Sequence, residues 1–327
     1  MKRREFIAGL GSAAASPLAA WAQQQALPVI GFLSGLSQTS LRMLDPIIRQ
    51  GLNEQGYVEG RNVEILHRWA EGRYDQLPAL AADLVRRRVA VIVAAGAGTP
   101  SALAAKSATA TIPIVFVVGG DPVELGLVGS LNHPGGNLTG VTILANELVG
   151  KRLELLHEIV PAATSIGFLV DPNNSGVKAE MRDAEITART LGLRLVVLNA
   201  SSPSEIETAF TSIEAQQIGG LVTAGAALFG VQGRQLAALA ARHAVPAIYH
   251  ARPTVEAGGL MSYGAIANDT VRQAFVYAGR ILKGEKPGDL PVQQSTGFEM
   301  VLNLKTAKAL GLEVPTATLL RADKVIE

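Results

Sequence analysis

One stretch of the sequence combines the residue types that bind an anionic group. Residues 96–101 read Gly-Ala-Gly-Thr-Pro-Ser, between an apolar run and a helical pattern. The free N–H groups at the start of a helix attract a carboxylate, and the hydroxyls of Thr99 and Ser101 could bind it beside Gly98. The alternative is that Thr99 only caps the helix.

The same stretch resembles the Gly-x-Gly-x-x-Gly fingerprint of dinucleotide-binding proteins, with Ser101 in the last place and Asp121 about twenty residues later. Two features disfavour a nucleotide. The stretch follows the third predicted strand rather than the first, and Pro100 stiffens the turn that a pyrophosphate would have to approach closely.

Two acidic residues stand directly after apolar runs. Asp121 follows the run at 112–118, and Asp171 follows the run at 166–170 in the second half of the chain. A carboxylate at either position could pair with a ligand amine. The alternative role of each is to cap the helix that follows.

No constellation in the sequence predicts catalysis or metal binding. The five histidines share no metal-ligand spacing, cysteine is absent, and neither His-Glu-x-x-His nor Gly-x-Ser-x-Gly occurs. No convincing set of nucleophile, base and acid can be assembled. The sequence therefore predicts no catalytic residue, no metal and no cofactor.

Alternating strands and helices must position these groups. Apolar or alternating runs predict strands at 28–34, 63–69, 89–95, 112–118, 166–170, 194–198, 219–224 and near 246. Amphipathic patterns predict helices at 40–55, 76–87, 100–108, 146–159, 176–191, 203–216, 231–242 and 268–283. This alternation is typical of an α/β protein with parallel sheets.

The strands form two series, which predicts two Rossmann-like lobes joined by hinge crossovers. The Gly-rich segments 134–142 and 258–264 are the candidate hinge strands, because Gly, Ser and Thr tolerate backbone rotation. Lobe 1 is predicted to comprise 27–140 and about 262–292. Lobe 2 is predicted to comprise 143–258 and about 296–327. The alternative is one large sheet with ordinary loops.

In open α/β sheets, ligands bind beyond the carboxyl ends of the strands. The residues at these ends are mostly small and polar, and Tyr249 adds a ring that could stack on a ligand. The candidate ligand-binding residues are Ser34, Gly98, Thr99, Ser101, Asp121, Asp171, Asn174, Ser175, Gly225 and Tyr249.

The first 22 residues predict export. They begin Met-Lys-Arg-Arg, continue with a short apolar run and end Ala-Trp-Ala, the pattern of a cleaved signal peptide. Arg3-Arg4 followed by Phe6-Ile7 further resembles a twin-arginine signal. The segment carries a net charge of +2, so the mature chain has −1. A near-neutral chain without cysteine predicts neither nucleic-acid binding nor a lipid anchor.

Several long phrases of the sequence resemble one family, the ABC-transporter substrate-binding proteins that include tryptophan- and tyrosine-binding receptors. The resemblance covers nearly the whole mature chain and is least distinct over 200–245. The matching phrases are residues 51–65, 75–94, 110–142, 151–161, 258–264 and 281–315.

The resemblance implies the fold of type I periplasmic binding proteins, in which two lobes close on a small molecule. It also implies an extracytoplasmic receptor that delivers its ligand to a membrane permease. Gly98, Thr99 and Asp121 fall in phrases that match the family's first lobe. Where the family often has a more polar loop, this chain has the apolar residues 224–229, which suggests a more apolar ligand surface.

The predicted function is that of a periplasmic, monomeric receptor for an ABC importer, closing on an amino acid or aromatic acid. The alternative is an exported enzyme on the same scaffold. A transcriptional repressor with a similar core would require a DNA-binding helix-turn-helix where this chain carries its export signal.

Overall fold

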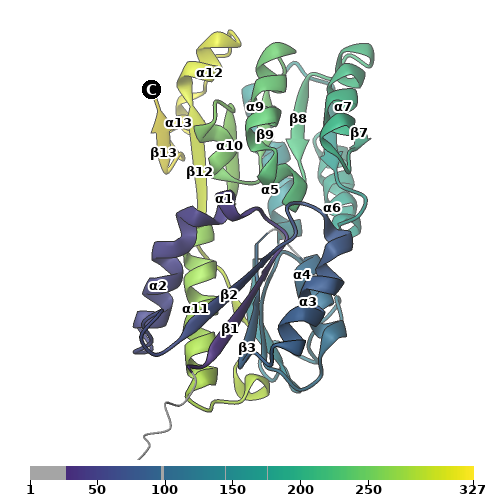
Figure 1. The fold of residues 1–327 in the computed structure, drawn as a ribbon. Coiled ribbons are helices and arrows are strands. Elements are labelled where there is room, and N and C mark those ends of the chain that lie inside the picture. Colours follow the sequence, from purple (N-terminus) through teal and green to yellow (C-terminus); the bar gives the residue numbers. More distant parts are fainter. Residues whose placement is uncertain (1–26, 97–98, 144, 175) are drawn as a thin grey trace, which may run out of the picture.

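The computed structural model describes residues 27–96, 99–143, 145–174 and 176–327. The predicted signal peptide at 1–22 lies outside these ranges. The chain forms two lobes, each built on a sheet covered by helices (Figure 1). The elements of lobe 1 are β1 Val29–Ser34, α1 Gln38–Leu41, η1 Arg42–Leu44, α2 Asp45–Asn53, β2 Glu64–Trp69, η2 Tyr74–Gln76, α3 Leu77–Arg86, β3 Val91–Ala94, α4 Thr99–Ala108, β4 Ile114–Val118, β5 Leu138–Thr142, α11 Ala267–Leu282, η3 Pro287–Asp289 and β11 Gln293–Gln294.

Lobe 2 contains most of the second half of the chain. Its elements are α5 Ala145–Ile159, β6 Ser165–Val170, α6 Val177–Thr190, β7 Arg194–Asn199, α7 Pro203–Ala215, β8 Gly220–Thr223, α8 Ala227–Val231, α9 Gly233–Arg242, β9 Ala247–Tyr249, α10 Arg252–Glu256, β10 Met261–Ala265, β12 Phe298–Asn303, α12 Leu304–Ala309, α13 Thr316–Leu320 and β13 Lys324–Ile326.

Both sheets repeat one strand order. Lobe 1 has the order β11-β5-β4-β3-β1-β2, with every pair parallel. Lobe 2 has the order β13-β12-β10-β9-β8-β6-β7, where only the β10–β12 pair is antiparallel. The first five strands of each lobe thus follow the doubly wound 2-1-3-4-5 order. The predicted α/β fold class with two parallel-sheet lobes is confirmed.

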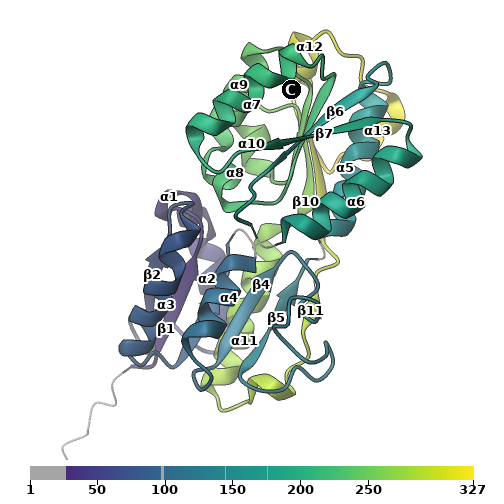
Figure 2. The ribbon, with the colours of Figure 1, turned by 90° about the vertical axis from the view of Figure 1, so that its right-hand side faces the viewer.

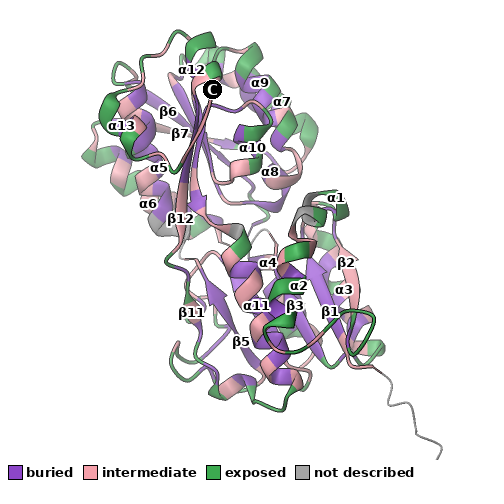
Figure 3. Cartoon of the chain, turned by 90° about the vertical axis from the view of Figure 1, so that its left-hand side faces the viewer, coloured by how far each residue is buried: buried purple, intermediate pink, exposed green. Residues whose placement is uncertain are grey.

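Helices cover both faces of each sheet because the buried strands are apolar on both sides. In lobe 1, α2 and α11 pack on one face and α3 and α4 on the other. In lobe 2, α5 and α6 lie on one face and α7, α9 and α10 on the other. Figure 3 shows the buried strands in purple, enclosed between helices whose outer sides are exposed.

The chain crosses between the lobes after β5, β10 and β11. These crossings lie a few residues beyond the predicted boundaries at 140 and about 262. Strand β5 stays in the first sheet through Thr142, and β10 pairs with β9 and β12 of the second sheet. Residues 262–265 therefore belong to lobe 2, because they complete its sheet.

Two glycines of the predicted hinge segments are required by the packing of the sheets. A Cβ at Gly140 would lie 2.1 Å from the carbonyl oxygen of Phe116, and a Cβ at Gly264 would lie 2.1 Å from that of His250. Both sit where a neighbouring backbone approaches closely, so glycine is required for packing within a sheet.

Candidate ligand-binding site

The carboxyl ends of β1 to β5 in lobe 1 and of β6 to β10 in lobe 2 point toward the space between the lobes (Figures 1 and 2). In the 2-1-3-4-5 order, the topological switch point lies between β1 and β3 in lobe 1 and between β6 and β8 in lobe 2. Ligands bind outside the strand ends at such points, so these two edges define the candidate site.

The lobe 1 edge is built from small neutral groups. Ser34, at the end of β1, is fully buried, and its hydroxyl accepts a hydrogen bond from the Leu36 N–H at 3.1 Å. Gly96 follows β3 with φ +88°, and a Cβ there would lie 2.3 Å from the Ser34 hydroxyl. Thr99 and Ser101, in the first turn of α4, are 2% and 1% exposed. Glycine at 96 thus lets two strand ends converge beneath the start of α4.

Asp121 lies one strand away from this switch point, after β4. It is half-buried, and its Oδ1 accepts a hydrogen bond from the Val123 N–H at 2.7 Å. The main-chain carbonyl of Asp121 accepts another from Leu125. Its observed contacts are those of a turn-capping residue.

The lobe 2 edge brings three predicted residues together. Asp171, at the end of β6, is 2% exposed and accepts a hydrogen bond from the Asn173 N–H at 2.9 Å. Asn174 is 3% exposed and donates to the Gly225 carbonyl at 2.6 Å, which joins the ends of β6 and β8. Burial raises the pKa of Asp171, and the negative charge of Glu205 adds to this effect.

Two charged residues that the sequence reasoning missed lie under the same edge. Arg152 of α5 is 1% exposed and donates to the Thr223 carbonyl at 2.7 Å. Glu180 of α6 is 5% exposed and accepts from the Gly225 N–H at 3.1 Å. Burial raises the pKa of Glu180, whereas the charge of Arg152 opposes that shift. The two buried side chains therefore interact electrostatically beneath β8.

His250 completes this cluster. Its main-chain N–H donates to the Thr223 hydroxyl at 3.2 Å, and its Nδ1 is buried with no hydrogen-bond partner among the described residues. Burial, aided by the nearby charge of Arg152, lowers the pKa of His250 to about 3. The imidazole is therefore neutral at pH 7.

The remaining predicted residues are not brought to these edges or cannot be placed. Tyr249 is 1% exposed in the lobe 2 core, and its ring lies against Gly259, where a Cβ would be 2.5 Å from Cε2. Trp69, which could also have offered a ring to a ligand, instead stacks on His67 with the ring centroids 4.9 Å apart. Gly98 and Ser175 lie outside the described residues.

The two lobes touch at the side of the site farthest from the crossings. The Tyr74 hydroxyl of lobe 1 accepts a hydrogen bond from the Ala227 N–H of lobe 2 at 2.8 Å. A Cβ at Gly35 would lie 3.2 Å from the Ala227 Cβ, and one at Gly230 would lie 3.1 Å from the Leu36 side chain. The apolar helix α8 thus packs on lobe 1 instead of presenting a polar loop.

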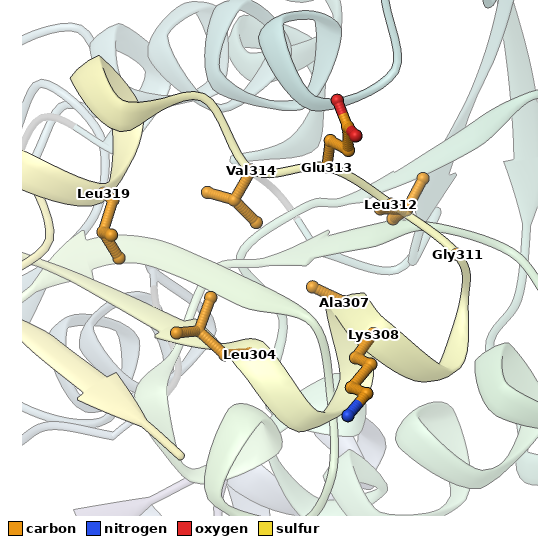
Figure 4. A pocket seen from close by; sticks show the side chains of 8 residues that line it. All are labelled: Leu304, Ala307, Lys308, Gly311, Leu312, Glu313, Val314 and Leu319. Carbon is orange, nitrogen blue, oxygen red and sulfur yellow. The ribbon is translucent and has the colours of Figure 1, made fainter.

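Two hollows of the described structure can be compared with the strand-end edges. One, of about 310 Å³, is a groove at the rim of the site between η2, α3 and α4, with Asn173 of lobe 2 on its edge. The other, of about 510 Å³, lies between α12 and α13 and is lined by Leu304, Leu312, Val314 and Leu319 with Lys308 and Glu313 (Figure 4). The second hollow contains no residue of the strand-end edges, so of these two it is the groove that adjoins the candidate site.

Over the described part of the chain, no helix is both long and apolar enough to cross a membrane. No group of three or more potential metal ligands occurs in that part either.

Comparison with known proteins identifies the family to which the chain belongs. The model of the family described as "ABC transporter substrate binding protein" matches residues 6–326. The chain belongs to this family of ABC transporter substrate-binding proteins. The predicted relationship is confirmed, and the solved structures that this chain resembles have the type I periplasmic binding protein fold.

Three members similar to this substrate-binding protein are informative. A tyrosine-binding protein of Clostridioides difficile (strain R20291) is 29% identical over 81% of this chain and 75% of its own length. An ABC domain from Streptococcus pneumonia in complex with L-Trp is 26% identical, with 92% of this chain and 100% of that chain covered and a TM-score of 0.82. A ligand-free, open substrate-binding protein from Clostridium difficile is 26% identical, with 92% and 99% covered and a TM-score of 0.64.

Members of this family are extracytoplasmic substrate-binding proteins and not enzymes; they bind small molecules and act with an ABC permease.

Proposed function

We propose that this protein is the receptor of an ABC importer and closes its two lobes on a small carboxylate, an amino acid or an aromatic acid. The family assignment supports the receptor role. The tyrosine-binding relative and the L-Trp complex support a ligand of this class, because tyrosine and tryptophan each carry a carboxylate and an aromatic ring.

The observation that carries lobe closure is the contact between Tyr74 and Ala227, on the side of the site away from the crossings. With the crossings on one side and this contact on the other, a ligand between the strand ends would be enclosed. A comparison of two similar solved structures also supports a closed arrangement of the lobes. At equal identity and equal coverage of this chain, the TM-score is 0.82 for the L-Trp complex and 0.64 for the ligand-free, open protein.

The carboxylate is proposed to bind at the N-terminus of α4. This helix has ten residues, and the hydroxyls of Thr99 and Ser101 lie in its first turn. The Thr99 hydroxyl oxygen lies 3.6 Å from the position that a Cβ on Gly176 would take, so the start of α4 faces the loop before α6 across the two lobes. A carboxylate there would benefit from the helix dipole and from free N–H groups.

Export and assembly complete the proposal. The signal-like residues 1–22 support a periplasmic location reached through the twin-arginine route, and the absence of cysteine supports a form without a lipid anchor. The receptor is proposed to act as a monomer that docks on its permease in the closed state, since only the closed state reports a bound ligand.

Thermal-shift measurements over L-amino acids, aromatic acids and sugars test the ligand class. The melting temperature is expected to rise with amino acids or aromatic acids, because a ligand that binds only the folded state stabilises it. Stabilisation by sugars and by no carboxylate would contradict the proposal. A signal-peptide reporter that still crosses the membrane in cells without the twin-arginine translocase would contradict the export route alone.

A further inference from the structure

The lobe 2 edge buries more negative than positive charge. Arg152, Asp171 and Glu180 are 1%, 2% and 5% exposed. The other titratable group there, His250, is neutral at pH 7 because burial and the charge of Arg152 lower its pKa to about 3. The described residues of this edge thus include one guanidinium and two carboxylates.

The guanidinium of Arg152 interacts electrostatically with Glu180. Its charge favours the ionised form of Glu180, whose carboxylate also accepts the Gly225 N–H. Asp171 has no such support. Among the described residues, the Asp171 carboxylate accepts one hydrogen bond, from the Asn173 N–H to Oδ1, and the neighbouring charge that affects it, Glu205, is also negative. In the part of the chain that the structure describes, no cation pairs with Asp171, and a buried carboxylate without a cation is costly.

Asp171 also has the right location for ligand binding. It ends β6 at the switch point of lobe 2, and Asn173 from the same loop lines the groove of about 310 Å³ together with Tyr74 and Pro100 of lobe 1. The start of α4, the proposed carboxylate site, faces this loop at Gly176. A ligand with a cation beside a carboxylate could therefore contact both lobes at once.

We infer that Asp171 binds the ammonium group of the ligand, so that the protein selects α-amino acids over acids that lack the amine. This inference rests on the proposed receptor function and narrows its ligand class. It assigns the amine to lobe 2 and not to Asp121, which is half-buried and lies after β4, away from the switch point.

Titration calorimetry on the full chain tests this assignment. The ligands are L-tryptophan and L-tyrosine, each paired with its analogue without the amine, indolepropionate and hydroxyphenylpropionate. The unaltered protein is expected to bind the preferred amino acid at least about tenfold more tightly than its analogue, because a charge-assisted hydrogen bond is lost with the amine. This comparison needs no variant.

Asp171→Asn is expected to weaken amino-acid binding about 10- to 100-fold and to remove the preference over the analogue. The melting temperature of the free variant is not expected to fall, because the substitution removes an uncompensated buried charge. Asp121→Asn, the matched control, is expected to keep both affinity and preference.

Three results would overturn the inference. If the analogues bind the unaltered protein as tightly as the amino acids, or if Asp171→Asn keeps the preference, the amine is not bound by Asp171, while the proposed carboxylate receptor stands. If no carboxylate binds the unaltered protein, the proposed ligand class fails and the inference fails with it.

Discussion

The two edges that face each other across the site have the same strand order but differ in charge: the lobe 1 edge carries neutral groups and the lobe 2 edge carries charged ones. Lobe 1 ends its switch-point strands with Ser34 and Gly96, beside the neutral first turn of α4. Lobe 2 ends the equivalent strands above a buried cluster that contains Arg152, Glu180 and Asp171. One topology thus supplies neutral hydrogen-bond donors from one side and charged groups from the other.

The difference teaches how a symmetric scaffold can orient an asymmetric ligand. A helix N-terminus favours an anion without placing a full charge in the site. A buried carboxylate favours a cation and disfavours a second anion. The ligand would therefore enter with its carboxylate toward lobe 1 and its amine toward lobe 2, and reversed binding would be penalised at both ends.

The largest effect that would sharpen this comparison is expected from Arg152→Met. The substitution leaves Glu180 buried beside no guanidinium, so the free energy of unfolding at pH 7 is expected to fall by about 3–5 kcal/mol. Urea denaturation measures this free energy of unfolding. The matched control in lobe 1 is Arg272→Met, which removes ion pairs whose arginine side chain is 25% exposed, with an expected loss of at most about 1 kcal/mol.

Equal losses in the Arg152→Met and Arg272→Met proteins would break the contrast between the lobes. The double variant Arg152→Met with Glu180→Gln is expected to recover part of the loss, because the orphaned charge is then removed.

The next effect concerns pH. The folded-state pKa of His250 is lowered to about 3, below its ordinary value of 6.5, so the unfolded chain takes up the proton first as pH falls. The contribution of the neutral imidazole is therefore fully present above pH 6.5 and is lost as pH falls toward 3. Between pH 6.5 and 5 the loss is expected to be about 2 kcal/mol.

Melting temperatures of the unaltered protein and of His250→Gln at pH 7.5 and pH 5 measure this loss. The variant is expected to lose less stability on acidification. The buried carboxyls Asp171 and Glu180, with raised pKa values, act in the opposite direction in both proteins, so the difference isolates His250. Replacing the exposed His133 by Gln is the control, and an equal response of both variants would refute the assignment to His250.

The smallest effect tests the contact that joins the two lobes. Tyr74→Phe removes the hydrogen bond from Ala227, worth about 1 kcal/mol, from the closed state alone. Ligand affinity is therefore expected to fall about fivefold with little change in the stability of each lobe. Titration calorimetry measures the affinity, and small-angle scattering measures the shift toward open molecules.

Tyr277→Phe is the matched control for Tyr74→Phe. It removes a hydrogen bond of 2.7 Å to the Pro291 carbonyl inside lobe 1, so it is expected to lower stability without changing affinity. If both variants changed affinity alike, the contact between Tyr74 and Ala227 would have no special role in closure.

Much of the architecture follows from local patterns in the sequence. Apolar runs and amphipathic periods predicted β1 to β4, β6 to β9 and most of the helices, because each burial pattern repeats within a few residues. The late strands β12 and β13 were not predicted. β13 has only three half-buried residues, and its pairing with β12 is fixed by residues more than twenty positions earlier.

The charged residues of lobe 2 are detectable in the sequence, because each interrupts the apolar stripe of its helix. Arg152 stands between Val149 and Leu156 on the apolar stripe of its helix, and Glu180 stands between Val177 and Ala184 on that of the next. A charge on a buried stripe is unusual and points to a buried partner. No local pattern could reveal the contact between Tyr74 and Ala227, because it joins residues 153 positions apart.

The crossing after β10 has a consequence for how the protein is made. Helix α11 covers one face of the first sheet with Val271, Phe275 and Ile281, yet it is synthesised after the five-stranded core of the second lobe. A ribosome-bound chain that ends before residue 267 would lack β12 and β13 of the second sheet, and one face of the first sheet would be covered by α2 without α11. Both cores are therefore completed only by residues after 266, and truncations before α11 are expected to aggregate through the apolar residues left exposed.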